Sequence, residues 1–356
     1  MVKDSMLYPL FFEPDYKKRV WGGTSLQDKL NKKIPYEHTG ESWEIACHDN
    51  GNSTIRNGVL AGKTLKEVLL SHGDEIIGHP MNINDKFPLL IKFIDAKDKL
   101  SVQVHPEDEY AIHVENGELG KSEAWYILHA KTGAKLIAGL RDGVSKEDFV
   151  KALNEGCLED VLNEVEVKAG DVIDIPAGLV HAIEDGILLA EIQQNSDTTY
   201  RVYDWNRIGL DGNMRELHVE KSLDVIDFEG KHSKEIAEGL SIKDGKNEII
   251  YYVANSYFSL EKIVLKETIK QKTENNYHIY ICVAGKGKVF HNSKEYPFAL
   301  GDSFMLPAAL GEYMLDGQAE LIKTYVPNSR EDVVQILQKQ GYTLEAINDK
   351  VRGVKQ

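Results

Sequence analysis

The sequence predicts a mainly β protein built from two copies of a small barrel, with a few added helices. Most segments are short runs of β-branched and aromatic residues bounded by Gly, Pro, Asp or Asn. Strands this short and this frequent are typical of a barrel or a sandwich. A length of 356 residues exceeds one compact core of ordinary size, and one sequence pattern recurs in both halves.

The predicted strands of the first half are the clearest, because each has an apolar or alternating run between turn residues. They are FPLLIKFIDA (87–96), KLSVQVH (99–105), AWYILHA (124–130), AKLIAGL (134–140), GDVIDIP (170–176) and ILLAEIQQ (187–194).

Helices are predicted where capping residues precede an apolar spacing of three and four. Thr64 with Glu67 has the spacing of a capping box, and Ser145 with Asp148 has cap spacing too. Pro106 suits a first helical turn. The predicted helices cover residues 64–73, 106–117, 145–156, 215–228 and 329–341.

The repeated pattern lies at GDVIDIPAGLVHAI (170–183) and GDSFMLPAALGEYM (301–314). In both segments a Gly-Asp pair is followed, at the same interval, by Pro-Ala. The position of His181 in the first copy is occupied by Glu312 in the second. The pattern therefore predicts a duplicated barrel in which only the first copy keeps a metal, while the second serves packing, stability or assembly.

A domain boundary is predicted in the polar, charged and glycine-bearing stretch 229–247, after which strands resume at EIIYYVA. We divide the chain near residue 238. Residues 1–237 are expected to form the catalytic domain with helical insertions. Residues 238–356 are expected to form a degenerate domain that lacks metal ligands and ends in a helix.

Composition limits the function classes. The formal net charge of −15 argues against nucleic acid and anionic membrane as partners. No apolar run approaches the roughly 18 residues of a membrane-spanning helix. The apolar patch from Leu7 to Phe12 is followed at once by acids, unlike an export signal. The three cysteines are far apart and in no CxxC pair, which fits a reducing compartment. We expect a cytoplasmic protein.

One set of side chains has the composition of a metal site. Gln103 and His105 are two residues apart on a predicted strand and therefore share a face. Glu123 opens the next strand, and His181 follows a turn made by Pro176 and Gly178. Two nitrogens and two oxygens suit Zn²⁺ and also Fe, Mn or Co. The other histidines, His218 and His278 among them, lack partners at ligand spacing.

With these residues in view, the chain resembles the cupins and, within them, the short bacterial form of the type I mannose-6-phosphate isomerases. The resemblance covers most of the first 230 residues, and the duplicated barrel extends it to about residue 326. The motifs that carry it are RVWGG (19–23), ESWE (41–44), SVQVHPEDEYA (101–111), GKSEAWYIL (120–128), IPAGLVHAI (175–183) and AEIQQNSDTTYRVYDWNR (190–207).

The resemblance implies a duplicated cupin (jelly-roll β-barrel) fold and one zinc ion per chain. The family's ligand roles fall on Gln103, His105, Glu123 and His181. Its catalytic roles fall on Arg201, Lys121 and Asp197. Substrate contacts are expected from Ser101, Trp21 and Glu191. The expected partner is a small sugar phosphate.

The implied reaction is the interconversion of mannose 6-phosphate and fructose 6-phosphate, which moves a proton between C1 and C2 through an enediol. Zinc would polarise the sugar oxygens, and Arg201 would stabilise the enediolate or grip the phosphate. Three candidates for the catalytic base that moves this proton remain: Asp197, Glu191 and a metal-bound water. Two alternatives also remain open: a metal-dependent cupin oxygenase and a non-catalytic sugar-binding cupin.

Overall fold

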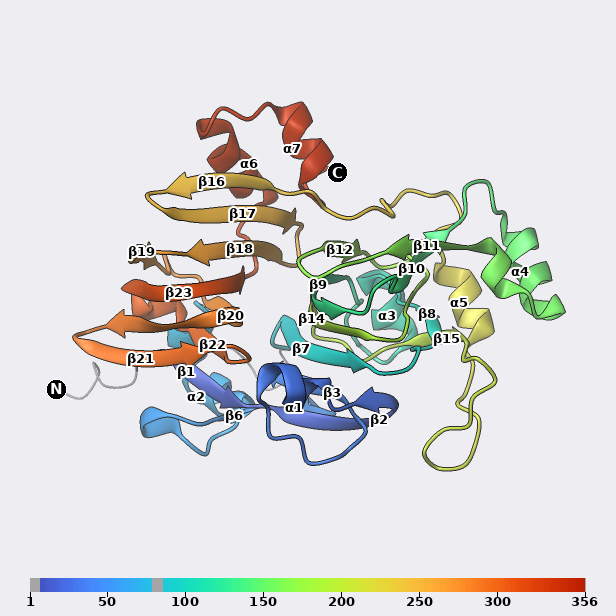
Figure 1. The fold of residues 1–356 in the computed structure, drawn as a ribbon, viewed down its shortest axis with the longest axis horizontal. Coiled ribbons are helices and arrows are strands. Elements are labelled where there is room, and N and C mark those ends of the chain that lie inside the picture. The colour runs from blue at the N-terminus through green and yellow to red at the C-terminus, as the bar shows by residue number, and fades with distance from the viewer. Residues whose placement is uncertain (1–6, 79–85, 356) are drawn as a thin grey trace.

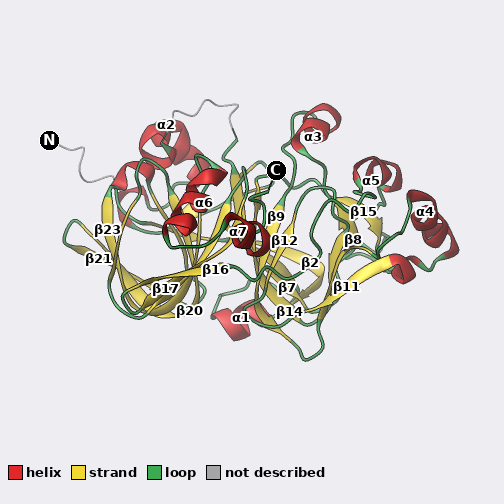
Figure 2. Cartoon of the chain, turned by 90° about the horizontal axis from the view of Figure 1, so that it is seen from above, coloured by secondary structure: helices red, strands yellow, loops and turns green. Residues whose placement is uncertain are grey.

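The computed structural model describes residues 7–78 and 86–355, and it is dominated by strands. Two strand-rich bodies lie side by side, one for each half of the chain (Figures 1 and 2). The predicted mainly β fold is confirmed. The six predicted strands all form, with ends trimmed by up to three residues. Among the described residues, no helix is both long enough and apolar enough to cross a bilayer.

The first half contains strands β2 to β15, together with β1, which joins the other half. Their bounds are β1 (Leu10–Glu13), β2 (Asp15–Gly23), β3 (Thr39–Ile45), β4 (Cys47–His48), β5 (Gly51–Asn52), β6 (Thr54–Ile55), β7 (Leu89–Ala96), β8 (Val102–Val104), β9 (Glu123–Ala130), β10 (Lys135–Leu140), β11 (Leu162–Glu166), β12 (Val172–Ile175), β13 (His181–Ile183), β14 (Ile187–Gln194) and β15 (Tyr200–Tyr203).

The second half contains the remaining strands, of which β20 and β23 are long enough to serve both sides of its barrel. Their bounds are β16 (Leu240–Asp244), β17 (Asn247–Ala254), β18 (Ser259–Leu265), β19 (Ile269–Lys272), β20 (His278–His291), β21 (Lys294–Ala299), β22 (Ser303–Leu306) and β23 (Glu312–Thr324).

The helices flank the strands: in Figure 1 those of residues 330–350 lie above β16, and those of residues 146–155 and 219–225 lie at the right of the first barrel. They are α1 (Ser25–Leu30), α2 (Leu65–Ile77), α3 (Asp108–Val114), α4 (Lys146–Glu155), α5 (Val219–Val225), α6 (Arg330–Lys339) and α7 (Leu344–Lys350).

The first barrel consists of two facing sheets. One has the strand order β12-β9-β14-β7-β3-β2, and the other has the order β11-β10-β13-β8-β15. The pairings between neighbours are antiparallel. In the second barrel the corresponding strands follow the order β16-β17-β18-β23-β20-β22, with β19 beside β23 and β21 beside β20. The same topology in both halves agrees with the repeat read from the sequence.

The two halves are joined through strands as well as through the linker. β1, near the start of the chain, pairs with β22 of the second barrel, Leu10 opposite Met305. β6 then pairs with the other end of β1. Strand β1 thus extends the sheet of the second barrel, and backbone hydrogen bonds tie the halves together.

A shared apolar core lies between the barrels. One cluster of buried side chains contains Ile91 and Phe93 from β7 together with Phe258, Ile279 and Met305 from the second half. Because these residues are fully buried, the two barrels pack as one body in this region.

Phe258→Ala is expected to lower the free energy of unfolding by about 3–5 kcal/mol, since it deletes a fully buried ring and leaves a cavity. Denaturant titration followed by circular dichroism measures this. Val59→Ala, at a side chain that is 65% exposed, is the control and should change stability by less than about 0.5 kcal/mol. Equal stability of both variants would show that this core does not hold the halves together.

Several helix boundaries differ from the predicted ones. The helix expected to end at Gly73 continues as α2 to Ile77, with a kink at His72, because Ile76 and Ile77 bury their side chains. The helix expected over 215–228 is only α5. Helices α1 and α7 were not predicted, since both are short.

The predicted linker 229–247 was also too long. Its last part forms β16, a strand with the polar sequence LSIKD at the edge of the sheet. An edge strand pairs on one side only and tolerates charged residues there, so its hydrophobic signal is weak. The capping boxes at Thr64 and Ser145 are confirmed.

Candidate metal centre and substrate cavity

Three of the four predicted ligands converge in the first barrel. One ligand atom from each of His105, Glu123 and His181 can be chosen so that all lie within 4.8 Å of one another. All three side chains are buried. Within residues 7–78 and 86–355, no other group of His, Cys, Asp or Glu side chains has this spacing.

Strand register explains how residues far apart in the chain meet here. Gln103 on β8 lies opposite His181 on β13, and His105 follows two residues later on the same face. Glu123 at the start of β9 pairs with Ile175 at the end of β12. The chain then turns through Pro176 and Gly178, whose φ of 87° is the left-handed conformation that glycine adopts most easily.

Both imidazoles are held by backbone carbonyls. His105 Nδ1 lies 2.9 Å from the carbonyl oxygen of Thr198, and His181 Nδ1 lies 2.8 Å from that of Leu179. A carbonyl can only accept, so each Nδ1 carries a proton and donates it. The lone pair of each neutral ring is therefore on Nε2, which faces Glu123 at 3.3 Å from His105 and 4.0 Å from His181. This is the tautomer that a metal ligand requires.

Burial keeps both rings neutral. Burial and the neighbouring Lys121 ammonium lower the pKa of His105 to about 3. Burial also lowers the pKa of His181. Glu123 behaves in the opposite way: although its burial opposes ionisation, the Lys121 ammonium holds the pKa of this carboxyl well below its usual range. A buried carboxylate beside two neutral imidazoles is the protonation state in which a divalent cation binds.

Gln103 completes the predicted set from the cavity side. Its side-chain amide nitrogen lies 3.3 Å from His181 Nε2. Rotation of the amide by half a turn would present its oxygen to the same place. Gln103 is half-buried, unlike the other three.

The donor set fits a metal ion. Among the described residues, Glu123 Oε1 accepts no aligned hydrogen bond, although the Lys121 ammonium lies 2.9 Å away. Glu123 Oε2 accepts from Trp125 Nε1 at 3.0 Å, which orients the carboxylate. A buried carboxylate oxygen without an aligned donor, beside two Nε2 lone pairs, is chemically suited to a cation.

A cavity of about 550 Å³ adjoins this centre. It is lined by seven of the ten site residues predicted from the sequence: Trp21, Ser101, Gln103, Lys121, Glu191, Asp197 and Arg201. The metal triad lies behind this lining, in contact with it through Gln103 and Lys121. The structure thus brings all ten residues together at one place.

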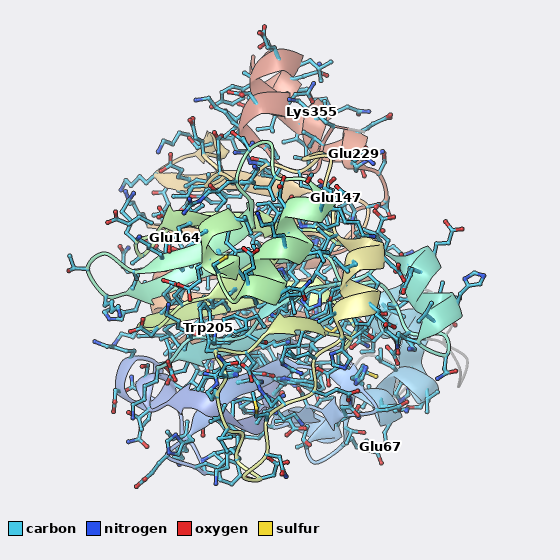
Figure 3. The ribbon with its side chains drawn as sticks, turned by 90° about the vertical axis from the view of Figure 1, so that its right-hand side faces the viewer. Glu67, Glu147, Glu164, Trp205, Glu229 and Lys355 are labelled. Carbon is cyan, nitrogen blue, oxygen red and sulfur yellow. The ribbon has the colours of Figure 1, made fainter. Side chains whose placement is uncertain are left out.

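Arg201, on β15, also lines the cavity. Its Nη1 donates to the carbonyl of Glu216 at 2.8 Å. Burial and the nearby Arg215 lower the pKa of Arg201. A guanidinium among other cations interacts favourably with an anionic ligand. Trp205, on the loop after β15 and labelled in Figure 3, donates to the Leu100 carbonyl at 2.7 Å and so fixes the wall that carries Ser101.

Two of the acids that line the cavity, Glu191 and Asp197, differ in how many interactions hold their carboxylates. Glu191 on β14 is buried, pairs with Lys92 Nζ at 2.9 Å and accepts from Trp125 at 2.9 Å. Burial and repulsion from Glu123 raise the pKa of Glu191. Asp197 is half-buried, and only its Oδ2 accepts a hydrogen bond from a described residue, Asn50.

Sequence reasoning missed a chain of charges beside these acids. Arg19 Nε donates to Glu41 Oε1 at 2.8 Å, and Lys92 lies between Glu41 and Glu191. Although burial opposes it, Arg19 and Lys92 lower the pKa of Glu41 to about 2. A signal was present in the sequence: Lys92 is the one charge inside the apolar run FPLLIKFI.

The cavity carries an excess of positive charge. Among its described lining residues the cations are Lys18, Arg19, Lys92, Lys121, Arg201 and Arg215. The acids are Glu41, Glu191, Asp197 and Asp211. A net positive cavity in a chain of net charge −15 selects for an anionic ligand.

Two family models match the chain. Phosphomannose isomerase type I, catalytic domain, matches residues 10–119. Mannose-6-phosphate isomerase, cupin domain, matches residues 248–326.

Curated relatives match over most of their length. The chain is 42% identical over 320 residues to the probable mannose-6-phosphate isomerase GmuF of Bacillus subtilis, covering 89% of this chain and 99% of that protein. It is 42% identical over 318 residues to mannose-6-phosphate isomerase ManA of the same organism, with the same coverage. It is 38% identical over 320 residues to mannose-6-phosphate isomerase of Streptococcus mutans, covering 90% and 99%.

Solved structures show the same fold. The crystal structure of mannose 6-phosphate isomerase from Bacillus subtilis superposes with a TM-score of 0.83 at 37% identity, covering 89% of this chain and 99% of that one. A putative mannosephosphate isomerase from Archaeoglobus fulgidus has a TM-score of 0.71 at 23% identity, covering 90% and 99%. The duplicated cupin fold expected from the sequence is therefore confirmed.

Proposed function

Because the chain belongs to the type I mannose-6-phosphate isomerases, it interconverts mannose 6-phosphate and fructose 6-phosphate, and we propose that Gln103, His105, Glu123 and His181 hold the metal ion. The observation that supports this ligand set most is the convergence of His105, Glu123 and His181 within 4.8 Å beside a cationic cavity. Membership of this family argues against the two alternatives, a metal-dependent cupin oxygenase and a non-catalytic sugar-binding cupin.

The proposed ion is one zinc per chain. Two imidazole nitrogens, one carboxylate and one amide oxygen form a four-ligand set of the kind that Zn²⁺ accepts. A bound zinc ion would polarise the carbonyl and hydroxyl oxygens of the sugar at C1 and C2. The chain's own part is to hold the ligands: the Thr198 and Leu179 carbonyls fix the two imidazoles, and Trp125 fixes Glu123.

Asp197 is proposed as the base that moves the proton between C1 and C2. It lines the cavity, and its Oδ1 accepts no hydrogen bond from the described residues. In Glu191, Oε2 accepts from Trp125, and Oε1 lies 2.9 Å from the Lys92 ammonium without an aligned hydrogen bond. A general base needs a free lone pair within reach of the carbon-bound proton. Glu191 is proposed instead to position the sugar and to fix Trp125.

The cations of the cavity are proposed to divide the remaining work. Arg201 stabilises negative charge on the enediolate oxygens, because its guanidinium lines the cavity. Lys121 lies nearest to the triad and assists ring opening or phosphate binding. Ser101 and Trp21 are proposed to contact the phosphate and the sugar.

The remaining proposals concern organisation and location. Residues 1–237 are proposed as the catalytic domain and residues 238–356 as a degenerate cupin domain without metal ligands. A sugar phosphate is the proposed substrate partner, and the cytoplasm is the proposed location, which the three free cysteines support.

Removal of the metal is expected to lower isomerase activity by about 100-fold or more, since its charge stabilisation is lost. Purified protein is dialysed against a chelator, and fructose 6-phosphate formation from mannose 6-phosphate is measured. Adding back Zn²⁺, Mn²⁺, Co²⁺ or Fe²⁺ separately identifies the ion that restores the rate. Full activity in protein shown by elemental analysis to be metal-free would contradict the proposed centre.

A further inference from the structure

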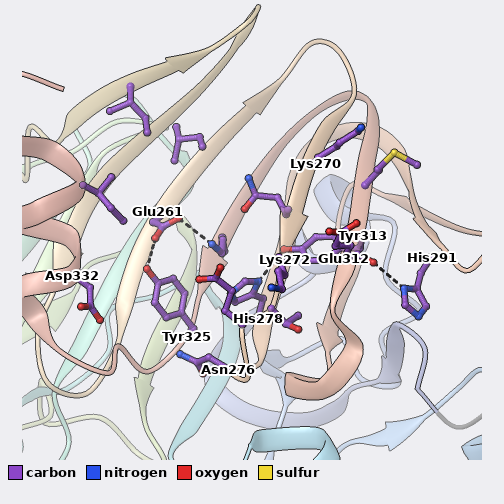
Figure 4. Close-up of a pocket in the computed structure, with 18 of the residues that line it drawn as sticks. Glu261, Lys270, Lys272, Asn276, His278, His291, Glu312, Tyr313, Tyr325 and Asp332 are labelled. Atoms are coloured by element: carbon purple, nitrogen blue, oxygen red, sulfur yellow. Dashed lines mark hydrogen bonds and ion pairs between the residues drawn. The ribbon is translucent and has the colours of Figure 1, made fainter. Parts of the chain in front are cut away.

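The second barrel contains a cavity of its own, of about 1280 Å³, more than twice the volume of the substrate cavity. Figure 4 shows side chains from several strands pointing into it, among them Glu261, His278, Tyr313 and Tyr325. The metal centre and the reaction do not use this cavity.

Strand register shows that the two cavities are equivalent places in the two barrels. In the first barrel Lys92 on β7 lies opposite Glu191 on β14. In the second, Glu261 on β18 lies opposite Lys323 on β23. The second barrel therefore has an ion pair at the same two strand positions as the first, with the basic and the acidic residue exchanged. Lys323 Nζ lies 3.5 Å from Glu261 Oε2.

A second register check gives the same alignment. Trp125 on β9 lies opposite Glu191, and Tyr280 on β20 lies opposite Lys323. Each pairing keeps one strand of the ion pair, β14 or β23, and adds the neighbouring strand, β9 or β20. The correspondence therefore extends over three adjacent strands in each barrel.

The metal-ligand positions can then be compared directly. Glu123 pairs with Ile175, the residue before Pro176, and His278 pairs with Leu306, the residue before Pro307. His278 therefore stands where Glu123 stands.

The facing strands replace two of the other three ligands, Gln103 and His181. Gln103 pairs with His181, and Lys272 pairs with Glu312. Lys272 thus occupies the position of Gln103, and its ammonium would repel a cation. The second barrel therefore keeps the cavity, but the positions that correspond to the proposed metal ligands carry other polar residues.

The floor of this cavity is an ordered hydrogen-bond network. Tyr325 donates to Glu261 Oε1 at 2.7 Å. The Tyr313 hydroxyl lies 2.9 Å from His278 Nδ1 and 2.6 Å from the Tyr280 hydroxyl.

His278 is the polar group that remains available. The side chain is 93% buried, and it lines the cavity. Its Nε2 has no hydrogen-bond partner among the described residues, whereas its Nδ1 is held by Tyr313. Burial, with Lys323 nearby, lowers the pKa of His278 well below its usual value. A buried neutral imidazole whose free nitrogen faces a cavity is suited to a hydroxyl group of a ligand.

Charge distinguishes the second cavity from the first. Its described basic lining residues are Lys270, Lys272, Lys323 and Lys339, and its acids are Glu261, Glu274, Glu312 and Asp332. The charges balance, whereas the substrate cavity has an excess of cations. A lining of balanced charges, tyrosines and amides favours an uncharged ligand with many hydroxyl groups.

We propose that the C-terminal barrel binds an uncharged sugar larger than the substrate, such as a disaccharide or the end of an oligosaccharide, in the cavity floored by Glu261, His278, Tyr313 and Tyr325. The volume admits more than one sugar ring, and the paired donors and acceptors of the floor match hydroxyl groups. This site is separate from the isomerase centre and does not depend on its metal.

The test uses sugars that the isomerase cannot convert. Methyl α-mannoside and methyl β-glucoside have a blocked anomeric carbon, and the methyl glycosides of mannobiose and cellobiose, blocked in the same way, are the disaccharide probes. Isothermal titration calorimetry with the full chain is expected to show saturable binding of a disaccharide, tighter than that of the methyl glycoside of a monosaccharide. Tighter binding of mannose 6-phosphate than of any neutral sugar at this site would overturn the charge argument.

Equivalent substitutions in the two barrels separate the sites. Asn276 and Lys121 stand two residues before His278 and Glu123 and line the two cavities. Asn276→Trp is expected to weaken disaccharide binding at least about tenfold and to leave isomerase activity unchanged. Lys121→Trp is expected to remove isomerase activity and to leave disaccharide binding unchanged.

A milder variant covers the case in which the bulky residue prevents folding. Tyr325→Phe removes one hydroxyl from the floor and should weaken disaccharide binding by a few-fold, with thermal unfolding measured alongside. The proposal is overturned if no neutral sugar binds the wild-type chain, or if Asn276→Trp and Tyr325→Phe bind as wild type does.

Discussion

His181→Ala is expected to lose the metal ion and to lower kcat/KM by about 10³-fold or more. The residue supplies one of two Nε2 lone pairs in a buried centre, and losing the several kcal/mol that a metal contributes to charge stabilisation corresponds to a factor of this size. Elemental analysis of the purified variant and steady-state kinetics with mannose 6-phosphate measure the two effects.

The repeat offers a matched control for this variant. Glu312 is the counterpart of His181 in the second barrel, because it pairs with Lys272 as His181 pairs with Gln103. The Glu312 side chain is exposed. Glu312→Ala should keep both metal and activity. Gln103→Ala should retain part of the metal, since three ligands remain. A His181→Ala protein that holds a full equivalent of metal would remove His181 from the ligand set.

Arg201→Ala is expected to keep its metal and to lower kcat by about 10²–10³-fold. The guanidinium lines the substrate cavity but is not among the converging ligand atoms. Loss of one preorganised donor to a developing oxyanion typically costs a factor of this order. Metal content and the separate values of kcat and KM are the measurements.

Whether the loss of activity appears in kcat or in KM shows which part of the substrate Arg201 contacts. A fall in kcat with little change in KM indicates contact with the enediolate, because that charge develops only in the transition state. A rise in KM alone would instead assign Arg201 to the phosphate. Arg141→Ala is the control, since Arg141 is exposed and lies outside the substrate cavity, and it should leave both constants unchanged.

Much of the site could be predicted because the residue types and their spacing along the chain indicate the metal-binding pattern. Gln103 and His105 share a strand face by their spacing alone, and Pro176 with Gly178 marks the turn before His181. The repeat of Gly-Asp and Pro-Ala predicted the second barrel, and the strand pairings of both halves agree with it. These features depend on local periodicity and turn chemistry, which a sequence contains.

Other features could not be predicted from local sequence patterns, because they join residues that are far apart in the chain. The ion pair of Lys92 with Glu191 joins positions 99 residues apart, and the insertion of β1 beside β22 joins the start of the chain to its last third. His278 lacked any partner at ligand spacing, yet register places it where Glu123 stands. Pairing between distant strands is selected by the packing of the whole core, so no window of sequence specifies it.

The sequence by itself predicted the kind of protein: a duplicated barrel with the proposed metal ligands in its first copy, because strand period, turn residues and ligand chemistry are local properties. Only the tertiary structure decided which charges meet in each cavity. It gave the first cavity an excess of cations and the second a balanced lining. The physical reason is that strand register, set by burial across the entire barrel, determines which distant side chains become neighbours.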